Sequence, residues 1–166
     1  MNYRSWEDQV PAVIKRDSVW KSKAYRLALF AADLSWHDST KLVEDKRTIS
    51  PADQLFRSTG AISADIEESY SRGTGRDRAR FYEYGLGSAR EARGWYNKGR
   101  HVLGESVVAH RIGLLAEVTK LLLTMIPNQR GGVLKEDPLG YHAEPPTQTL
   151  DQSIDAEELL NVVPLP

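Results

Sequence analysis

Cysteine is absent from this chain of 166 residues, which excludes disulfides, thiolate metal sites and cysteine nucleophiles. Long apolar runs are missing too. The most apolar stretch, residues 112–126, is interrupted by Glu117 and Lys120 and falls short of the roughly 20 residues that span a bilayer. The N-terminal residues lack the basic and then apolar pattern of a signal peptide. We therefore expect a cytoplasmic protein that does not contact membranes.

Sequence patterns that support catalysis are missing as well. The four histidines are scattered, with neither a His-x-x-x-His pair nor the Glu-x-x-His spacing of di-iron bundles. Gly73-Thr74-Gly75 lacks the Gly-Lys-Ser/Thr end of a phosphate-binding loop, and no Gly-x-Ser-x-Gly motif surrounds a nucleophile. We therefore predict that the protein is not an enzyme and carries neither a metal nor a cofactor.

Charge is unevenly distributed along the chain, although the net charge is only −1. Residues 1–131 hold 21 of the 22 lysines and arginines and 16 of the 23 acids, a balance of +5. Residues 132–166 hold one lysine and seven acids, a balance of −6. A mildly basic body thus precedes an acidic tail. This pattern fits an anionic partner or self-masking, and it equally fits a solvated body with a solubilising tail.

Helical periodicity dominates the sequence, with no strand-like alternation of useful length and no internal repeat. Four helices are predicted, at residues 18–36, 50–72, 77–101 and 105–126. The first carries an apolar stripe from Trp20 to Leu34 at three- and four-residue spacing. The second opens with Ser50 as its cap and Pro51 at the first helical position. Pro127 and the glycines after it are expected to end the fourth.

Four such helices with short links predict an all-α fold, an antiparallel up-down four-helix bundle. The expected organisation is an N-terminal arm at 1–17, the bundle at 18–131 and a flexible, proline-rich acidic tail at 132–166. The tail ends in a short apolar motif, IDAEELLNVVPLP. This motif is either a docking segment for a groove, on this bundle or on a partner, or an unstructured terminus.

A reversal of the chain about Thr74 would place the second and third helices side by side. This register pairs Gly60 with Ser88, Ala61 with Gly87, Arg57 with Glu91, and Glu68 with Arg80. We predict that the small residues let the two backbones approach closely. The charged pairs would fix the register, each contributing about 0–1 kcal/mol when exposed.

A family motif extends from Phe56 to Glu91. Its matching residues in the second helix are Arg57, Ile62, Ile66, Glu68 and Arg72, and in the third Phe81, Gly87, Ser88 and Glu91. Departures from it are Ala61, Asp65, Glu67 and Ser69. Together with Trp20 at the start of the first helix, these residues resemble the four-helix bundle family of ribosomal RNA intervening-sequence proteins. The resemblance covers about residues 18–127 and extends, more distantly, to the accessory proteins of diversity-generating retroelements.

The resemblance implies an up-down bundle without enzymatic activity that often assembles into a homopentameric ring. Some members of the family are linked to RNA or to a reverse transcriptase. The partners implied for this chain are therefore further copies of itself, and RNA or a nucleic-acid-processing protein.

Arginines gather around the turn between the second and third helices, and more follow along the third. The candidate nucleic-acid-binding residues are Arg72, Arg76, Arg78, Arg80 and Arg93. In a ring this cluster would repeat and attract an anion, and Tyr70, Tyr82 and Tyr96 are expected to stack on unpaired bases. Asp77 and Glu83 lie among the arginines, so a solvated, salt-bridged face is the alternative.

Two functions remain open from the sequence. The first is a non-enzymatic, ring-forming helical scaffold that associates with RNA through the basic cluster. The second is a protein-interaction adaptor whose C-terminal tail or bundle groove docks a partner protein.

Overall fold

The computed structural model describes residues 2–131 and 156–166. Its elements are α1 (Tyr3–Gln9), α2 (Ala12–Lys15), the 3-10 helix η1 (Ser18–Lys21), α3 (Lys23–Leu42), α4 (Ile49–Tyr70), α5 (Gly75–Leu103), α6 (Glu105–Arg130) and α7 (Ala156–Asn161). No strand occurs in these two described ranges, and the prediction of an all-α fold is confirmed. The prediction of a flexible tail at 132–155 lies outside the described residues.

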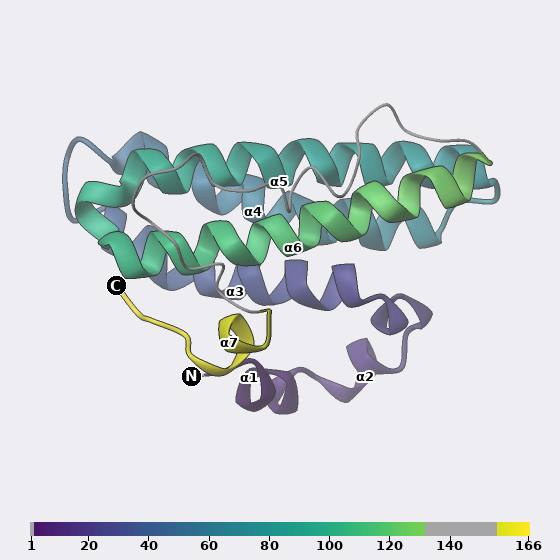
Figure 1. The fold of residues 1–166 in the computed structure, drawn as a ribbon, viewed down its shortest axis with the longest axis horizontal. Coiled ribbons are helices and arrows are strands. Elements are labelled where there is room, and N and C mark those ends of the chain that lie inside the picture. Colours follow the sequence, from purple (N-terminus) through teal and green to yellow (C-terminus); the bar gives the residue numbers. More distant parts are fainter. Residues whose placement is uncertain (1, 132–155) are drawn as a thin grey trace, which may run out of the picture.

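Four long helices, α3 to α6, enclose the core. Each packs along the next one in sequence, and α3 also contacts α6, so that the long helices lie lengthwise beside one another (Figure 1). The chain reverses between α5 and α6 at the single residue Gly104, whose φ of +86° is a conformation that side chains with a Cβ rarely adopt. The core is built from apolar residues of all four helices, with Leu34, Ile62, Ala89 and Leu115 among those without exposed surface.

Three predicted helix boundaries are wrong for identifiable reasons. Trp20 belongs to η1 rather than to the first long helix, because the Ser22 hydroxyl accepts a bond from the Tyr25 amide and begins α3 there. The second helix begins at Ile49, so Ser50 is not its cap. The last helix continues through Pro127 to Arg130, although a proline inside a helix removes one hydrogen bond and crowds the preceding turn.

The N-terminal arm packs against the core. Trp6 on α1 is buried, and its ring centroid lies 5.0 Å from that of Phe30 on α3. Tyr3 meets the same Phe30 ring edge-on at 5.3 Å. The Asn2 side chain caps α1 in a reciprocal pair of bonds with Ser5, which gives this short helix a fixed start.

The C-terminal motif also packs on the body. Helix α7 contacts both α6 and α1, and Leu159 is only 2% exposed. The two ends of the chain therefore lie on the same side of the molecule (Figure 1). Of the alternatives open from the sequence, the structure shows the motif docked in a groove of its own chain.

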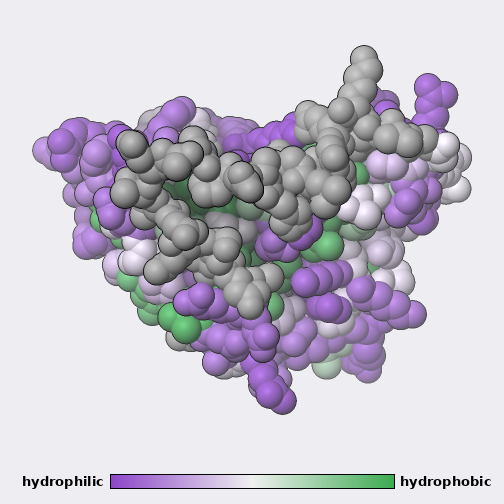
Figure 2. Space-filling model, in the orientation of Figure 1, coloured by the Kyte–Doolittle hydropathy of each residue, from purple (hydrophilic) through white to green (hydrophobic). Residues whose placement is uncertain are grey.

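The visible surface is mainly hydrophilic, with hydrophobic residues in separate patches (Figure 2). Among the described residues, no helix combines the length and apolarity that a membrane crossing requires.

Candidate functional site

The predicted basic residues divide into two places. Arg72 follows the end of α4, and Arg76, Arg78 and Arg80 lie in the first two turns of α5, so these four surround one turn. Arg93 lies 13 residues beyond Arg80 on α5, about 20 Å along the helix. The turn thus gathers four of the five predicted residues. Their role in binding nucleic acid stays a prediction.

Several of these arginines already contact groups of the chain. Arg72 forms an ion pair with Glu68 and lies 4.2 Å above the centroid of the Phe81 ring. Arg80 donates from Nε to the Tyr84 hydroxyl at 2.6 Å. The predicted pair of Glu68 with Arg80 is therefore wrong. A carboxylate one helical turn before Arg72 is in closer reach than a residue on the facing helix.

The rings expected to stack on bases are mostly inaccessible. Tyr82 and Tyr96 are buried on the inner face of α5, so their predicted stacking role is wrong. The half-buried Tyr70 lies beneath Arg78, whose Cζ is 5.8 Å from the ring centroid. The exposed ring at this end is Tyr84, one residue outside the buried stripe.

The predicted contact between Arg57 and Glu91 is also wrong. Arg57 Nη1 lies 3.9 Å from Asp53 Oδ2 on its own helix, and Glu91 accepts a hydrogen bond from Trp95 Nε1 at 3.1 Å. In the described part of the chain the two residues form no ion pair. Both lie on the outer surfaces of their helices, so the helices pair in the expected direction but through other faces.

The glycine of α5 that lies against α4 is Gly85. A Cβ on Gly85 would lie 3.4 Å from the Ile62 carbonyl oxygen and 3.5 Å from Asp65 Cβ. Gly60 and Gly87 meet nothing within 4 Å, and Gly87 is exposed. The predicted crossing through Gly60 and Gly87 is therefore wrong. Two residues turn a helix by about 200°, so Gly85 and Gly87 lie on opposite sides of α5.

Ser88, the remaining member of the predicted motif, sits beside Asp65 of α4. Burial, and secondarily the charge of Glu68, raise the pKa of Asp65 to about 6, while a hydrogen bond from Ser88 opposes the shift. This small polar contact, rather than a charged pair, faces the α4–α5 interface near Gly85.

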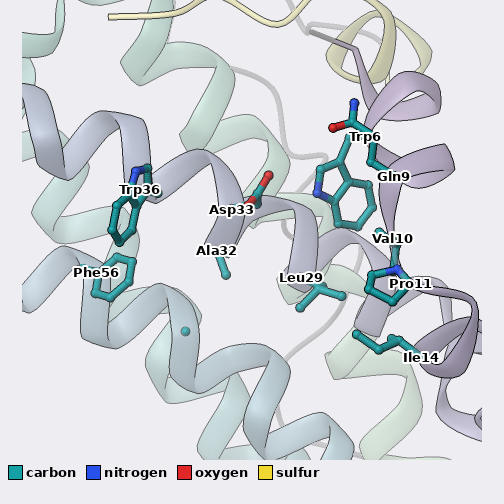
Figure 3. A pocket seen from close by; sticks show the side chains of 11 residues that line it. Trp6, Gln9, Val10, Pro11, Ile14, Leu29, Ala32, Asp33, Trp36 and Phe56 are labelled. Atoms are coloured by element: carbon teal, nitrogen blue, oxygen red, sulfur yellow. The ribbon is translucent and has the colours of Figure 1, made fainter.

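A hydrophobic hollow lies on a face formed by α3 and α4, here called the α3–α4 face. A cavity of about 520 Å³ opens between the arm and this face. Its lining residues include Trp6, Val10, Ile14, Leu29, Trp36 and Phe56. The side chains of the arm form one wall, and the rings of Trp36 and Phe56 close the opposite end (Figure 3). The cavity is predominantly apolar, with Asp33 as its one charged lining residue.

Trp36 and Phe56 also line a second hollow of about 360 Å³ on the other side of the two rings. Trp36 is 62% exposed and Phe56 43% exposed. Their ring centroids are 5.9 Å apart in an edge-to-face arrangement, which fixes both rings at the surface. Val43 and Ile49 extend the exposed apolar surface. This pair was not predicted from the sequence. Its signal there is an aromatic residue in each of two adjacent helices, just beside the buried stripe.

A buried ion pair crosses the core between α3 and α6. Asp38 and Arg111 have side chains 0% and 1% exposed. Arg111 donates from Nε to Asp38 Oδ2 at 2.8 Å and from Nη2 to Oδ1 at 3.1 Å, the two-point geometry that makes such pairs strong. The Tyr96 hydroxyl of α5 donates a third bond to Asp38 Oδ2 at 2.8 Å. Both Asp38 oxygens are therefore satisfied without water.

His110 links this ion pair to the C-terminal segment. Arg111 Nη1 lies 2.8 Å from His110 Nδ1, and His110 Nε2 lies 2.7 Å from the Leu159 carbonyl oxygen. Because arginine only donates and a carbonyl only accepts, both contacts are satisfied by the neutral ring with its proton on Nε2. Burial and then the Arg111 cation lower the pKa of His110, against opposing contributions from the Leu159 carbonyl and Asp38. Burial of a neutral imidazole agrees with this tautomer.

These polar residues hold the C-terminal segment. Arg111 Nη2 donates to the Pro164 carbonyl oxygen at 3.0 Å, so the donors of Arg111 are shared between Asp38, His110 and the segment. Within residues 2–131 and 156–166, no three His, Asp or Glu side chains are grouped to hold a metal ion. The chemistry that the site can perform is recognition of main-chain carbonyl groups.

The chain matches no protein-family model, no curated protein and no solved structure. The resemblance to the four-helix bundle family of ribosomal RNA intervening-sequence proteins therefore stays a prediction from the motif residues.

Proposed function

We propose that the protein is a non-enzymatic scaffold, an antiparallel up-down four-helix bundle that self-assembles through its α3–α4 face. The observation that carries the proposal is the exposed pair Trp36 and Phe56 between two apolar hollows. Large contiguous apolar patches are uncommon on monomers and mark interaction surfaces. Aromatic anchors surrounded by less energetic contacts are typical of interface centres.

A ring is the form of assembly that the resemblance favours, with five copies. Closed rings are built from two different patches that meet head to tail. The cavity between the arm and α3 is concave, and the exposed rings of Trp36 and Phe56 border it. These surfaces are available for such a contact, and they do not fix the number of copies.

Sedimentation velocity and native mass spectrometry test the assembly directly. The wild-type chain should run as a closed oligomer, whereas the double variant Trp36→Ser, Phe56→Ser should shift towards monomer while keeping its helical circular dichroism. Val13→Ser is the matched control, because Val13 is 70% exposed but does not line either hollow. A monomeric wild type, or a double variant that assembles like wild type, would contradict the proposal.

A second candidate function is RNA association through the turn between α4 and α5. It is favoured by the three arginines Arg76, Arg78 and Arg80 beside the exposed ring of Tyr84. Single-stranded RNA should bind at low salt, and the affinity should fall steeply as salt rises. Replacing the three arginines by glutamine should abolish binding, with the exposed Arg57→Gln as control. Binding that survives the triple replacement would exclude this surface.

A further inference from the structure

A groove along α3 and α6 is filled by the C-terminal residues 157–166. Leu159 enters it at Gly113, where a Cβ would come within 3.2 Å of Leu159 Cδ2. Leu27 and Leu114 line the same place, and the void left there is only about 10 Å³. Leu159 therefore occupies a closely fitting site whose floor is Gly113, where a Cβ would press on the leucine side chain.

Two main-chain carbonyl groups of the segment are bound beyond this leucine. His110 holds the carbonyl oxygen of Leu159 at 2.7 Å, and Arg111 holds that of Pro164 at 3.0 Å. The two carbonyl contacts do not depend on the sequence of the peptide, because every peptide has main-chain carbonyl groups. The site at Gly113 instead selects the side chain that fits it. The combination is that of a site for a peptide segment.

The residues that bind the segment are positioned by the body of the protein. Arg111 is fixed by Asp38 of α3, and Asp38 is fixed in turn by Tyr96 of α5. Gly113 belongs to the middle of α6. None of these supporting contacts involves the C-terminal segment, so the site keeps its geometry when the segment leaves, and binding does not have to organise it.

The end of the segment is open to solvent. Leu165 is 54% exposed, and with Pro166 it borders an open hollow of about 300 Å³ on α3. Residues 132–155, 24 in number, reach at most about 80 Å when extended. Gly113 and the C-terminal end of α6 are separated by about 26 Å along the helix axis. The length of chain therefore allows the segment to leave without disturbing α6.

We propose that this groove is a peptide-binding site whose internal, displaceable ligand is the chain's own C-terminal segment. A partner protein occupies it with a segment of the same chemistry. That segment places a leucine on the Gly113 floor, presents main-chain carbonyl groups to His110 and Arg111, and ends in an apolar, proline-containing stretch. The internal segment competes at a roughly millimolar effective concentration, so an external segment binds when it is tighter or when the internal one is lost. The site includes neither Trp36 nor Phe56, so it stands or falls independently of the assembly proposed above.

The test uses the full chain and a fluorescein-labelled synthetic peptide of residues 154–166 as the probe. Leu159→Asp in the chain should empty the groove, because a buried carboxylate without a partner is strongly disfavoured. Fluorescence anisotropy should then show the probe binding to this variant at least about tenfold more tightly than to wild type, because the internal competitor is gone. Adding Gly113→Leu should abolish binding. Gly94→Leu is the matched control, because Gly94 has open space around it on α5 and should change nothing. Equal affinity for wild type and Leu159→Asp, or binding that Gly113→Leu leaves intact, would overturn the proposal.

The wild-type chain provides a second readout that does not depend on the folding of any variant. Unlabelled peptide at millimolar concentration should displace the internal segment and accelerate amide hydrogen exchange of residues 158–162 severalfold. Exchange in the middle of α6 should stay unchanged. If the peptide leaves the exchange of residues 158–162 unchanged, the segment is not a displaceable ligand and the proposal is overturned.

Discussion

Replacing Asp38 by alanine tests whether the buried ion pair holds the helices together. The substitution removes every acceptor that Asp38 offers and leaves Arg111, whose side chain is 1% exposed, without a counter-charge. Removing one partner of such a pair costs about 3–5 kcal/mol, against a total stability of about 5–15 kcal/mol for a folded domain. Asp38→Ala should therefore lose a large part of the stability of the protein.

The assay is urea unfolding followed by far-ultraviolet circular dichroism. With a slope of about 2 kcal/mol per molar urea, the expected loss lowers the midpoint by about 2 M. Asp53→Ala is the control, because Asp53 is exposed and its nearest cation, Arg57, is 3.9 Å away; an exposed pair of this kind contributes at most about 1 kcal/mol.

A double variant separates the charge effect from the loss of packing. Asp38→Ala combined with Arg111→Met removes both charges, so it should recover much of the stability lost in the single variant. It should also weaken the binding of the C-terminal segment, since the bond to Pro164 is lost. The reasoning is refuted if Asp38→Ala costs less than about 1 kcal/mol, or if the double variant loses as much as the two single variants added together.

Three further predictions concern single positions. Gly87→Ala should raise the free energy of unfolding by up to about 1 kcal/mol through helix propensity. Gly85→Ala should gain less stability or lose some, because its Cβ would contact the Ile62 carbonyl oxygen. The urea unfolding midpoints of the two variants measure this difference. The pKa of Asp65 is raised to about 6, so the charged form opposes folding; Asp65→Asn should raise the melting temperature at pH 7.5, and the gain should vanish near pH 3.5. The pKa of His110 is lowered by burial and Arg111, so the neutral ring stabilises the folded protein; this contribution should be complete above the usual histidine pKa of about 6.5 and should be lost as the pH falls through the lowered value. A free energy of unfolding that does not decrease from pH 7.5 to 4.5 in the Asp65→Asn variant would contradict this last prediction.

The direction and approximate register of the α4–α5 pair could be predicted, but its contact face could not. A reversal about Thr74 predicts that facing residues have numbers that sum to about 148. Gly85 and Ile62, which lie in contact, have numbers that sum to 147. The face was wrong because α5 contains four glycines between residues 85 and 99, and periodicity alone does not say which of them is inside. The buried stripe shows that Gly85 faces inward, since Tyr82, Gly85, Ala89 and Ala92 recur at alternating steps of three and four residues.

The polar core could have been suspected from the same periodicity. Asp38 lies four residues after the buried Leu34, and Arg111 lies three after Val108 and four before Leu115. Both are charged residues at positions where the stripe requires apolar ones. What the sequence could not supply is that these two positions meet across the core, because that depends on how α3 and α6 are rotated towards each other.

Stability alone does not explain the ion pair. A well-packed pair of apolar side chains in place of Asp38 and Arg111 would stabilise a helical core at least as well, because the cost of desolvating two charges offsets much of their attraction. The difference lies in the remaining donors of the guanidinium. Asp38 and His110 hold the group in one orientation. Nη2 donates one of its hydrogens to Asp38, and its other hydrogen reaches the carbonyl oxygen of Pro164. An apolar core could bury Leu159, but it could not bind the main chain beside it. The polar residues are thus accounted for by recognition of the C-terminal segment, and the same argument makes them the part of the core where substitutions change binding as well as stability.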